Sequence, residues 1–262
     1  MTTASTSTSL FKLFSLEGKT ALVTGGAGLY GRQIVRALAE AGATVWSASR
    51  NNEALEREAA PLREEGLEVR TALLDQGDEQ SILALRDRLG SLDILVNNAV
   101  ARPLKDGCDS PARAFEESMR INATGLFMLT RAMGGIMNDG GSIITIGSIM
   151  GLVAPEPANY AGTSMHGWNP DYSFHKGGQV NYTRFLASYY GPRGIRANVI
   201  HPGGFQTEDH PEEFVQQYSE RTCLGRLANS SDLMGIIVFL ASDASVYITG
   251  TNIPVDGGYT AK

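Results

Sequence analysis

The sequence predicts an α/β protein with a doubly wound parallel sheet of about seven strands and helices on both faces. Three observations predict this fold. Short β-rich apolar runs alternate with helical stretches along the chain. The first run leads through a glycine-rich turn into a helical pattern. The chain has 262 residues, of which 42% are hydrophobic and 30 are glycines, and this suits one such unit with an ample core and many tight turns.

The expected elements follow one another with short turns between them. The strands are Thr20–Thr24, Thr44–Ala48, Val69–Leu74, Ile94–Asn97, Ser142–Ile146, Arg196–Ile200 and Asn252–Val255. After the helix that follows the glycine turn, helical stretches are expected at Glu53–Glu65, Glu79–Leu89, Pro111–Met137, Tyr172–Tyr190 and Ser231–Ala241. The Thr- and Ser-rich residues 1–12 are expected to form a disordered tail. Residues 13–262 are expected to form a single domain, because no linker or repeat divides them.

Composition argues against several classes of function. The net charge is −6 and no basic cluster occurs, which argues against nucleic acid as a partner. No apolar run is long enough to span a membrane, and the N-terminus lacks the basic start and apolar core of a secretory signal. Cys108, Cys223 and the four histidines show no metal-ligand spacing, so no metal is expected. Free thiols are the default in a reducing cytosol, and a cytoplasmic location is expected.

The glycine turn follows the first strand directly. Gly25, Gly28 and Gly31 lie between the strand and a helical pattern that ends at Gly42. Glycines let the backbone approach a pyrophosphate, and the free N–H groups at the start of the helix attract its negative charge. Strand, glycine turn and helix in this order predict a dinucleotide-binding site.

Tyr172 and Lys176 are the residues most indicative of chemistry. Their four-residue spacing places them on one face of the expected helix. A phenol titrates near pH 10, which is too high for easy proton exchange at neutral pH, and a nearby ammonium favours the phenolate. The pair is therefore a candidate for acid and base catalysis.

Taken together, the motifs resemble those of the short-chain dehydrogenase/reductase family, over nearly all of the chain from Leu16 to Thr260. The matching residues, in chain order, are the glycine turn, Asn98 and Ala99 after the fourth strand, Asn122 in a helix, Ser148 after the fifth strand, Tyr172 and Lys176, the run Pro202–Thr207 and the ending Val255–Gly258. The resemblance implies a Rossmann-type fold and hydride transfer between a nicotinamide and a secondary alcohol or ketone.

The same resemblance implies roles for four catalytic residues. Ser148 would hydrogen-bond the substrate oxygen, and Tyr172 would exchange the proton. Lys176 would favour the phenolate and bind the nicotinamide ribose. Asn122 would hold a water that links Lys176 to solvent. The resemblance also implies a homotetramer or a homodimer, with the two helices Pro111–Met137 and Tyr172–Tyr190 as candidate interfaces.

NADP(H) is expected in preference to NAD(H). Where relatives that bind NAD carry an acidic residue at the end of the second strand, this chain has Ser49 followed by Arg50, which suits a 2′-phosphate. The residues expected to bind the cofactor are Gly25, Gly28, Leu29, Tyr30, Gly31, Ser49, Arg50, Asp75, Asn98, Ala99, Tyr172, Lys176, Pro202, Gly203 and Thr207.

The substrate is expected to be a small molecule. Both ends of the chain resemble the sugar-acid and polyol dehydrogenases of the family. The interval between Ser148 and Tyr172 is longer than usual because of the segment Pro155–Pro170, which is expected to form a wall of the substrate site. The expected substrate contacts are Ser148, Tyr160, His166 and Trp168. The segment Gln206–Cys223 is expected to cover the substrate.

Two alternative functions remain open. Leu29 stands where short members of the family usually carry a glycine, and the resulting spacing resembles that of extended sugar-nucleotide epimerases and dehydratases. Those enzymes need a larger C-terminal substrate domain than residues 208–262 provide. The second alternative is a dinucleotide sensor without catalysis, which would be expected to lose Ser148, Tyr172 or Lys176.

Overall fold

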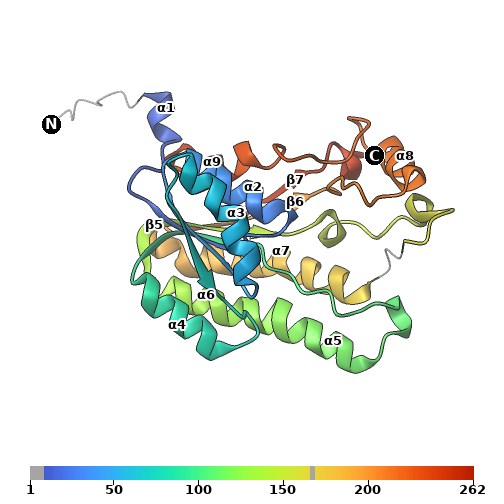
Figure 1. Ribbon diagram of the computed structural model, residues 1–262, viewed down its shortest axis with the longest axis horizontal. Helices are drawn as coiled ribbons and strands as arrows, with labels where there is room; N and C mark the ends of the chain where they lie inside the picture. The colour runs from blue at the N-terminus through green and yellow to red at the C-terminus, as the bar shows by residue number, and fades with distance from the viewer. Residues whose placement is uncertain (1–8, 166–168) are drawn as a thin grey trace.

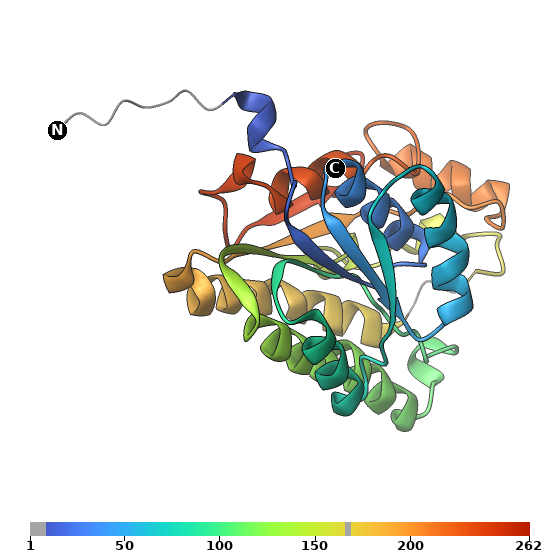
Figure 2. The ribbon, with the colours of Figure 1, turned by 60° about the vertical axis from the view of Figure 1, so that its left-hand side comes forward.

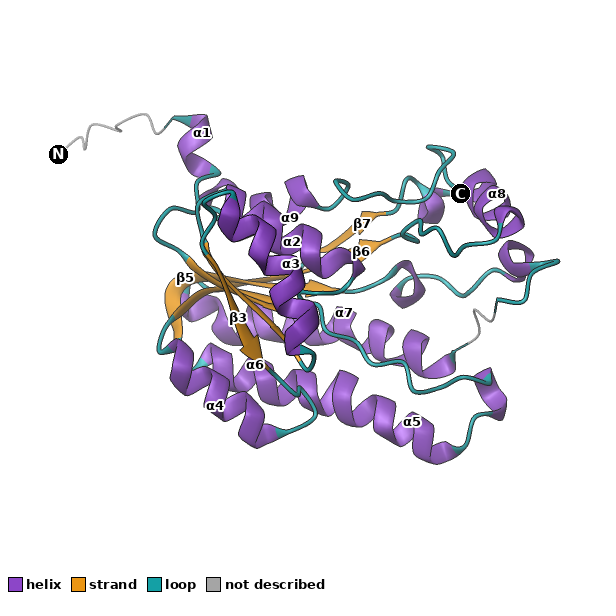
Figure 3. Cartoon of the chain, viewed as in Figure 1, coloured by secondary structure: helices purple, strands orange, loops and turns teal. Residues whose placement is uncertain are grey.

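A parallel sheet forms the centre of the molecule (Figures 1 and 3). The computed structural model describes residues 9–165 and 169–262. Within them, seven strands lie in the order β3-β2-β1-β4-β5-β6-β7. Their bounds are β1 Thr20–Thr24, β2 Thr44–Ser49, β3 Val69–Leu73, β4 Leu92–Asn97, β5 Met137–Ile146, β6 Arg196–Pro202 and β7 Asn252–Val255. The direction of winding reverses between β1 and β4, which makes the carboxyl ends of these strands the expected place for a ligand.

Helices cover both faces of the sheet, as the sequence predicts (Figure 2). The helices α2, α3 and α9 pack on one face, and α4, α6 and α7 pack on the other. The α-helices are α1 Leu10–Leu13, α2 Leu29–Glu40, α3 Asn52–Glu64, α4 Glu79–Leu89, α5 Ala112–Met119, α6 Leu126–Gly134, α7 Pro170–Tyr190, α8 Glu212–Arg221 and α9 Met234–Ala241. The predicted doubly wound parallel sheet is confirmed.

The central strands are apolar at nearly every position because both of their faces are buried. In β1, Ala21 and Val23 point into the core beneath α2 and α9, whereas Leu22 points into the core on the α6 and α7 face. All three side chains are fully buried. The sheet is therefore held from both sides, and its carboxyl ends form a rigid edge for the loops that follow.

The structure differs from the sequence prediction in two places. Residues 10–12 belong to the short helix α1 rather than to the expected tail, and the Phe14 ring that follows α1 lies 6.3 Å from the Phe239 ring; residues 1–8 lie outside the described chain. The expected long helix from Pro111 is interrupted by the π-helical turn η2 (Arg120–Gly125) and ends at Gly134, so that Met137 opens β5. The segment Gln206–Cys223, for which no helix or strand was predicted, contains helix α8; that it covers the substrate stays a prediction.

Candidate active site

The carboxyl ends of β1, β2, β4, β5 and β6 open into one cavity of about 800 Å³. Among the described residues, its lining includes fourteen of those expected to bind cofactor or substrate, from seven segments of the chain, whereas Lys176 is not among the lining residues. The fourteen are Gly25, Gly28, Leu29, Tyr30, Gly31, Ser49, Asn98, Ala99, Ser148, Tyr160, Tyr172, Pro202, Gly203 and Thr207. Residues far apart in the sequence meet here because parallel strands all end at the same edge.

The glycine turn is built for close approach to a ligand. Gly25 has φ +66°. The side-chain amide of Asn98 donates to the Thr24 carbonyl at 2.9 Å and to the Gly25 carbonyl at 3.0 Å. A Cβ on Gly31 would lie only 2.1 Å from the Gly25 carbonyl oxygen. No side chain caps α2 at Gly28, so the N–H groups of its first turn are open to an anion. The turn therefore suits the pyrophosphate of a dinucleotide.

Leu29 and Tyr30 take different positions at the start of α2. The Leu29 side chain is 47% exposed and lines the cavity. The Tyr30 hydroxyl donates to the Gly203 carbonyl at 2.9 Å, and its ring meets Phe205 edge-on at 5.1 Å. Burial raises the pKa of Tyr30, which keeps this donor protonated. Tyr30 thus joins the glycine turn to the turn that follows β6, on the other side of the cavity.

The end of β2 contributes less than the sequence predicts. Ser49 and Asn51 line the cavity, but the exposed Arg50 is not among the lining residues. Asp75, expected beside the adenine, is likewise absent from the lining. Its carboxylate accepts the Gly77 N–H at 2.8 Å and so shapes its own turn.

Ser148, Tyr172 and Lys176 come together where β5 ends beside the first turns of α7. Ser148 is extended, with φ −169° and ψ 156°, and its Oγ accepts the Met150 N–H at 3.1 Å. The Lys176 Nζ donates to the Ile146 carbonyl at 2.6 Å and lies 5.7 Å from the centre of the Tyr172 ring. The predicted one-turn spacing of the tyrosine and the lysine on α7 is thus observed, with the lysine held on the sheet.

Lys176 is almost completely buried. Burial, and to a lesser extent the charge of Arg102, lowers the pKa of Lys176 to about 7. The neighbouring His175 is also buried, and burial followed by the charges of Lys176 and Arg102 lowers its pKa to about 3. A neutral His175 therefore packs edge-on against the Tyr172 ring at 5.3 Å.

Asn122 lies in the π-helical turn η2, and its amide binds the loop after β4. Its Nδ2 donates to the Ala101 carbonyl at 2.8 Å and to Ser118 Oγ at 3.0 Å, and its Oδ1 accepts the Ala101 N–H at 2.9 Å. The Ser118 hydroxyl in turn donates to the buried Asp171 carboxylate at 2.5 Å. Asn122 therefore fixes the backbone next to Arg102, a contact that the sequence analysis did not predict.

Arg102 is a site residue that the sequence analysis missed. Its guanidinium carbon lies 4.7 Å from the centre of the Tyr172 ring, and the side chain lines the cavity. Within the described residues, no carboxylate forms an ion pair with it. Its position four residues after Asn98, at the carboxyl end of a central strand, is a signal that could have identified it.

The family is decided by comparison with known proteins. A family model described as enoyl-(acyl carrier protein) reductase matches residues 29–260. Galactitol 2-dehydrogenase (L-tagatose-forming) from Cereibacter sphaeroides is 32% identical, over 95% of this chain and 97% of its own. The chain belongs to the short-chain dehydrogenase/reductase family. It is therefore an oxidoreductase, as the sequence predicts.

Solved structures of this family superimpose on nearly the whole chain. A short-chain type dehydrogenase/reductase from Mycobacterium marinum has a TM-score of 0.85 and 31% identity, covering 97% of this chain and all of that one. A gluconate 5-dehydrogenase from Burkholderia cenocepacia, in complex with NADP and tartrate, has a TM-score of 0.83 and 30% identity, with 96% and 99% covered.

In this short-chain dehydrogenase/reductase, the segment after η3 (Ile149–Gly151) packs against α8. The Tyr160 ring lies 5.5 Å from that of Phe214, Gln217 donates to the Ala161 carbonyl at 3.0 Å, and Arg221 pairs with Glu156 at 2.9 Å. Burial raises the pKa of Tyr160. Tyr160 lines the cavity, whereas His166 and Trp168, also expected to contact substrate, lie outside the described residues.

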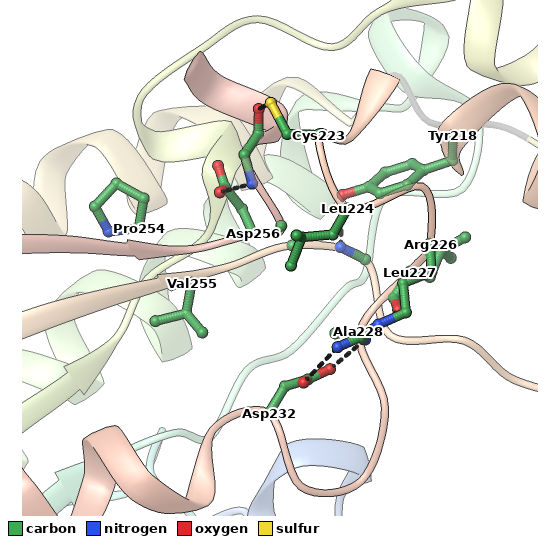
Figure 4. Close-up of a pocket in the computed structure, with 14 residues that line it drawn as sticks. Tyr218, Cys223, Leu224, Arg226, Leu227, Ala228, Asp232, Pro254, Val255 and Asp256 are labelled. Atoms are coloured by element: carbon green, nitrogen blue, oxygen red, sulfur yellow. Dashed lines mark hydrogen bonds and ion pairs between the residues drawn. The ribbon is translucent and has the colours of Figure 1, made fainter. Parts of the chain in front are cut away.

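A second cavity of about 420 Å³ lies on the other side of the turn after β6 (Figure 4). It shares Gly203, Gly204 and Tyr218 with the main cavity. The Gly204 N–H donates to the Tyr218 hydroxyl at 2.6 Å, and Arg226 pairs with Asp232 at 2.7 Å. These contacts support the back of the turn. None of the expected catalytic residues lines this cavity, so the chemistry is assigned to the larger one.

Across residues 9–165 and 169–262, no helix combines the length and the apolar character needed to cross a membrane.

Proposed function

We propose that the protein is an NADP(H)-dependent dehydrogenase that interconverts a secondary alcohol and a ketone on a sugar acid or a polyol. One observation carries the proposal: Ser148, Tyr172 and Lys176 meet at the strand ends, beside a glycine turn that suits a dinucleotide. The bound nicotinamide supplies or accepts the hydride, and the protein supplies position, charge and the proton.

The proton is handled by Tyr172. In reduction its hydroxyl gives a proton to the substrate oxygen as the carbonyl becomes an alcohol, and in oxidation the phenolate takes that proton back. Ser148 Oγ accepts the Met150 N–H, which leaves its own hydrogen free to donate to the substrate oxygen. Arg102, 4.7 Å from the ring centre, places positive charge beside the phenolate, and Lys176, 5.7 Å away, adds a second positive charge in its protonated form.

NADP(H) is proposed in preference to NAD(H). Ser49 lines the cavity at the end of β2, and residues 49–51 contain no acid that would repel a 2′-phosphate. Arg50 is exposed next to this edge and is free to reach an added phosphate. A gluconate 5-dehydrogenase among the structural relatives binds NADP, which supports the same choice.

Arg102 favours a sugar acid over a neutral polyol. A guanidinium in the cavity without a carboxylate partner among the described residues is suited to bind a substrate carboxylate in two parallel hydrogen bonds. Asp209, also in the lining, is an acceptor for substrate hydroxyls. The names of relatives include both a galactitol and a gluconate dehydrogenase, so the family accommodates both substrate types.

The test measures turnover of a panel of sugar acids and of polyols of equal length, each with NADP and with NAD. Turnover is monitored by the absorbance of the nicotinamide. Tyr172→Phe should abolish turnover and leave the cofactor Kd within about threefold of wild type, because it removes only the hydroxyl. Arg102→Leu should raise KM for sugar acids by about 10- to 100-fold, the value of a charge-assisted hydrogen bond. Arg113→Leu, an exposed arginine of α5 outside the cavity, is the control.

Four results would count against the proposal or against one of its parts. Activity in Tyr172→Phe would remove the proton-transfer role. Equal losses for acids and polyols in Arg102→Leu would limit Arg102 to supporting the tyrosine ring. Turnover of a sugar nucleotide without net NADP reduction would favour the epimerase alternative that Leu29 suggests. Tight cofactor binding without turnover of any substrate in the panel would favour the dinucleotide sensor.

The proposal includes a homotetramer or homodimer in the cytoplasm. Helix α7 carries three aromatic side chains that the isolated chain leaves open, namely Phe174, Phe185 and Tyr189, with exposed fractions of 67%, 57% and 64%. An apolar helix face of this kind is suited to contact a second copy. Sedimentation of the purified protein tests the assembly.

A further inference from the structure

A fully buried histidine lies directly behind the catalytic serine. His201 of β6 has no exposed surface. Its Nδ1 lies 2.8 Å from the Ser148 carbonyl oxygen, and its Nε2 lies 3.1 Å from the side-chain amide of Asn252 in β7. One imidazole therefore connects the loop after β5 to the edge strand β7, across β6.

The hydrogen-bond pattern defines what the imidazole does. The Ser148 carbonyl is an acceptor only, so His201 Nδ1 carries the proton and donates it. The Asn252 side-chain oxygen Oδ1 lies 3.1 Å from the other ring nitrogen, Nε2, so that β7 contacts the far side of the imidazole. The Gly151 N–H also donates to the Ser148 carbonyl, at 2.9 Å. The carbonyl oxygen thus has both of its lone pairs occupied.

These bonds fix the peptide that carries the serine. Gly147 N–H donates to the Ile200 carbonyl at 2.7 Å, which continues the pairing of β5 with β6 up to the serine. A Cβ on residue 147 would lie 2.7 Å from His201 Nδ1, so the ring fills the space that the glycine leaves. The sheet therefore fixes the residue before the extended Ser148, and the imidazole fixes the Ser148 carbonyl.

We infer that His201 is a positioning residue for Ser148: its Nδ1–H fixes the Ser148 peptide so that Oγ points at the substrate oxygen. The inference rests on the proposed role of Ser148 in hydride transfer. A reacting group displaced by about 1 Å can cost about 100-fold in rate. Loss of the Nδ1 donor should therefore lower kcat while the cofactor, which binds along the glycine turn, keeps its affinity.

A matched pair of amide variants tests the inference. The Asn side chain places its Nδ2 donor where imidazole Nδ1 lies, whereas Gln places its donor nearer to Nε2. His201→Asn should therefore retain kcat within about threefold of wild type. His201→Gln and His201→Leu should lose about 10- to 100-fold in kcat, with the cofactor Kd unchanged. Equal losses of kcat in His201→Asn and His201→Gln would overturn the inference. Losses of kcat that run parallel to the losses of Tm across the Asn, Gln and Leu variants would also overturn it.

The second measurement repeats His201→Gln in the Ser148→Ala background. If the histidine acts through the serine, the double variant should be as slow as Ser148→Ala alone, since no Oγ remains to be misplaced. A further loss of tenfold or more would show that His201 acts elsewhere and would reject the inference. Full activity of Ser148→Ala by itself would instead reject the proposed role of the serine, and the two failures are thus distinguishable.

Discussion

Burial of Lys176 should make the stability of the cofactor-free protein depend on pH. Lys176 is 3% exposed, and the pKa of its ammonium falls from 10.5 to about 7, first because of burial and second because of Arg102. Between these two values, the unfolded chain binds a proton that the folded chain lacks. Raising the pH across this window therefore stabilises the folded state. Below about pH 7 both states bind the proton, and the contribution becomes constant.

The magnitude follows from the same values. One pKa unit corresponds to about 1.4 kcal/mol, so the full window corresponds to about 5 kcal/mol. Over the practical range from pH 7 to pH 9, linkage gives a gain of about 2 kcal/mol in the free energy of unfolding, because half of the folded molecules are already neutral at pH 7.

The assay is urea unfolding followed by circular dichroism at pH 7, 8 and 9, at one protein concentration. Lys176→Met has nearly the same length and no titration, so its free energy of unfolding should gain about 2 kcal/mol less than that of wild type. Lys105→Met, at an exposed lysine, should follow wild type. Parallel curves for wild type and Lys176→Met would refute the claim that burial neutralises this lysine.

Three further predictions concern the cavity. Gly31→Ala should weaken cofactor binding at least tenfold in a fluorescence titration, because its Cβ meets the Gly25 carbonyl. The control is Gly235→Ala, because a Cβ on this residue of α9 meets open space; the free energy of unfolding of this variant should be unchanged or about 0.5–1 kcal/mol higher. Arg50→Ala should raise the NADP Kd about tenfold and leave the NAD Kd nearly unchanged, and equal changes would contradict the NADP assignment. Tyr160→Ala should change substrate KM by more than threefold with an unchanged cofactor Kd; an unaltered substrate profile would remove Tyr160 from the substrate wall.

The sequence determined the fold class and the identity of the central residues. Alternating strands and helices permit few architectures other than a covered parallel sheet. Strand ends in such a sheet converge, so Gly25, Ser148 and Tyr172 could be placed together from their positions after or beside successive strands. The spacing of Lys176 from Tyr172 is a property of the helix itself.

Only the tertiary structure decided the contacts that set the chemistry around these residues. Arg102 stacks on Tyr172, and His201 binds Ser148. Lys176 is buried. Each of these features depends on segments that are far apart in the sequence, and no local sequence pattern predicts it. Likewise, α8 packs on Tyr160, while Arg50 and Asp75 stand outside the cavity lining. Local propensity determines where the backbone turns. The direction of a side chain and the dielectric constant around it depend on which other parts of the chain pack against that side chain.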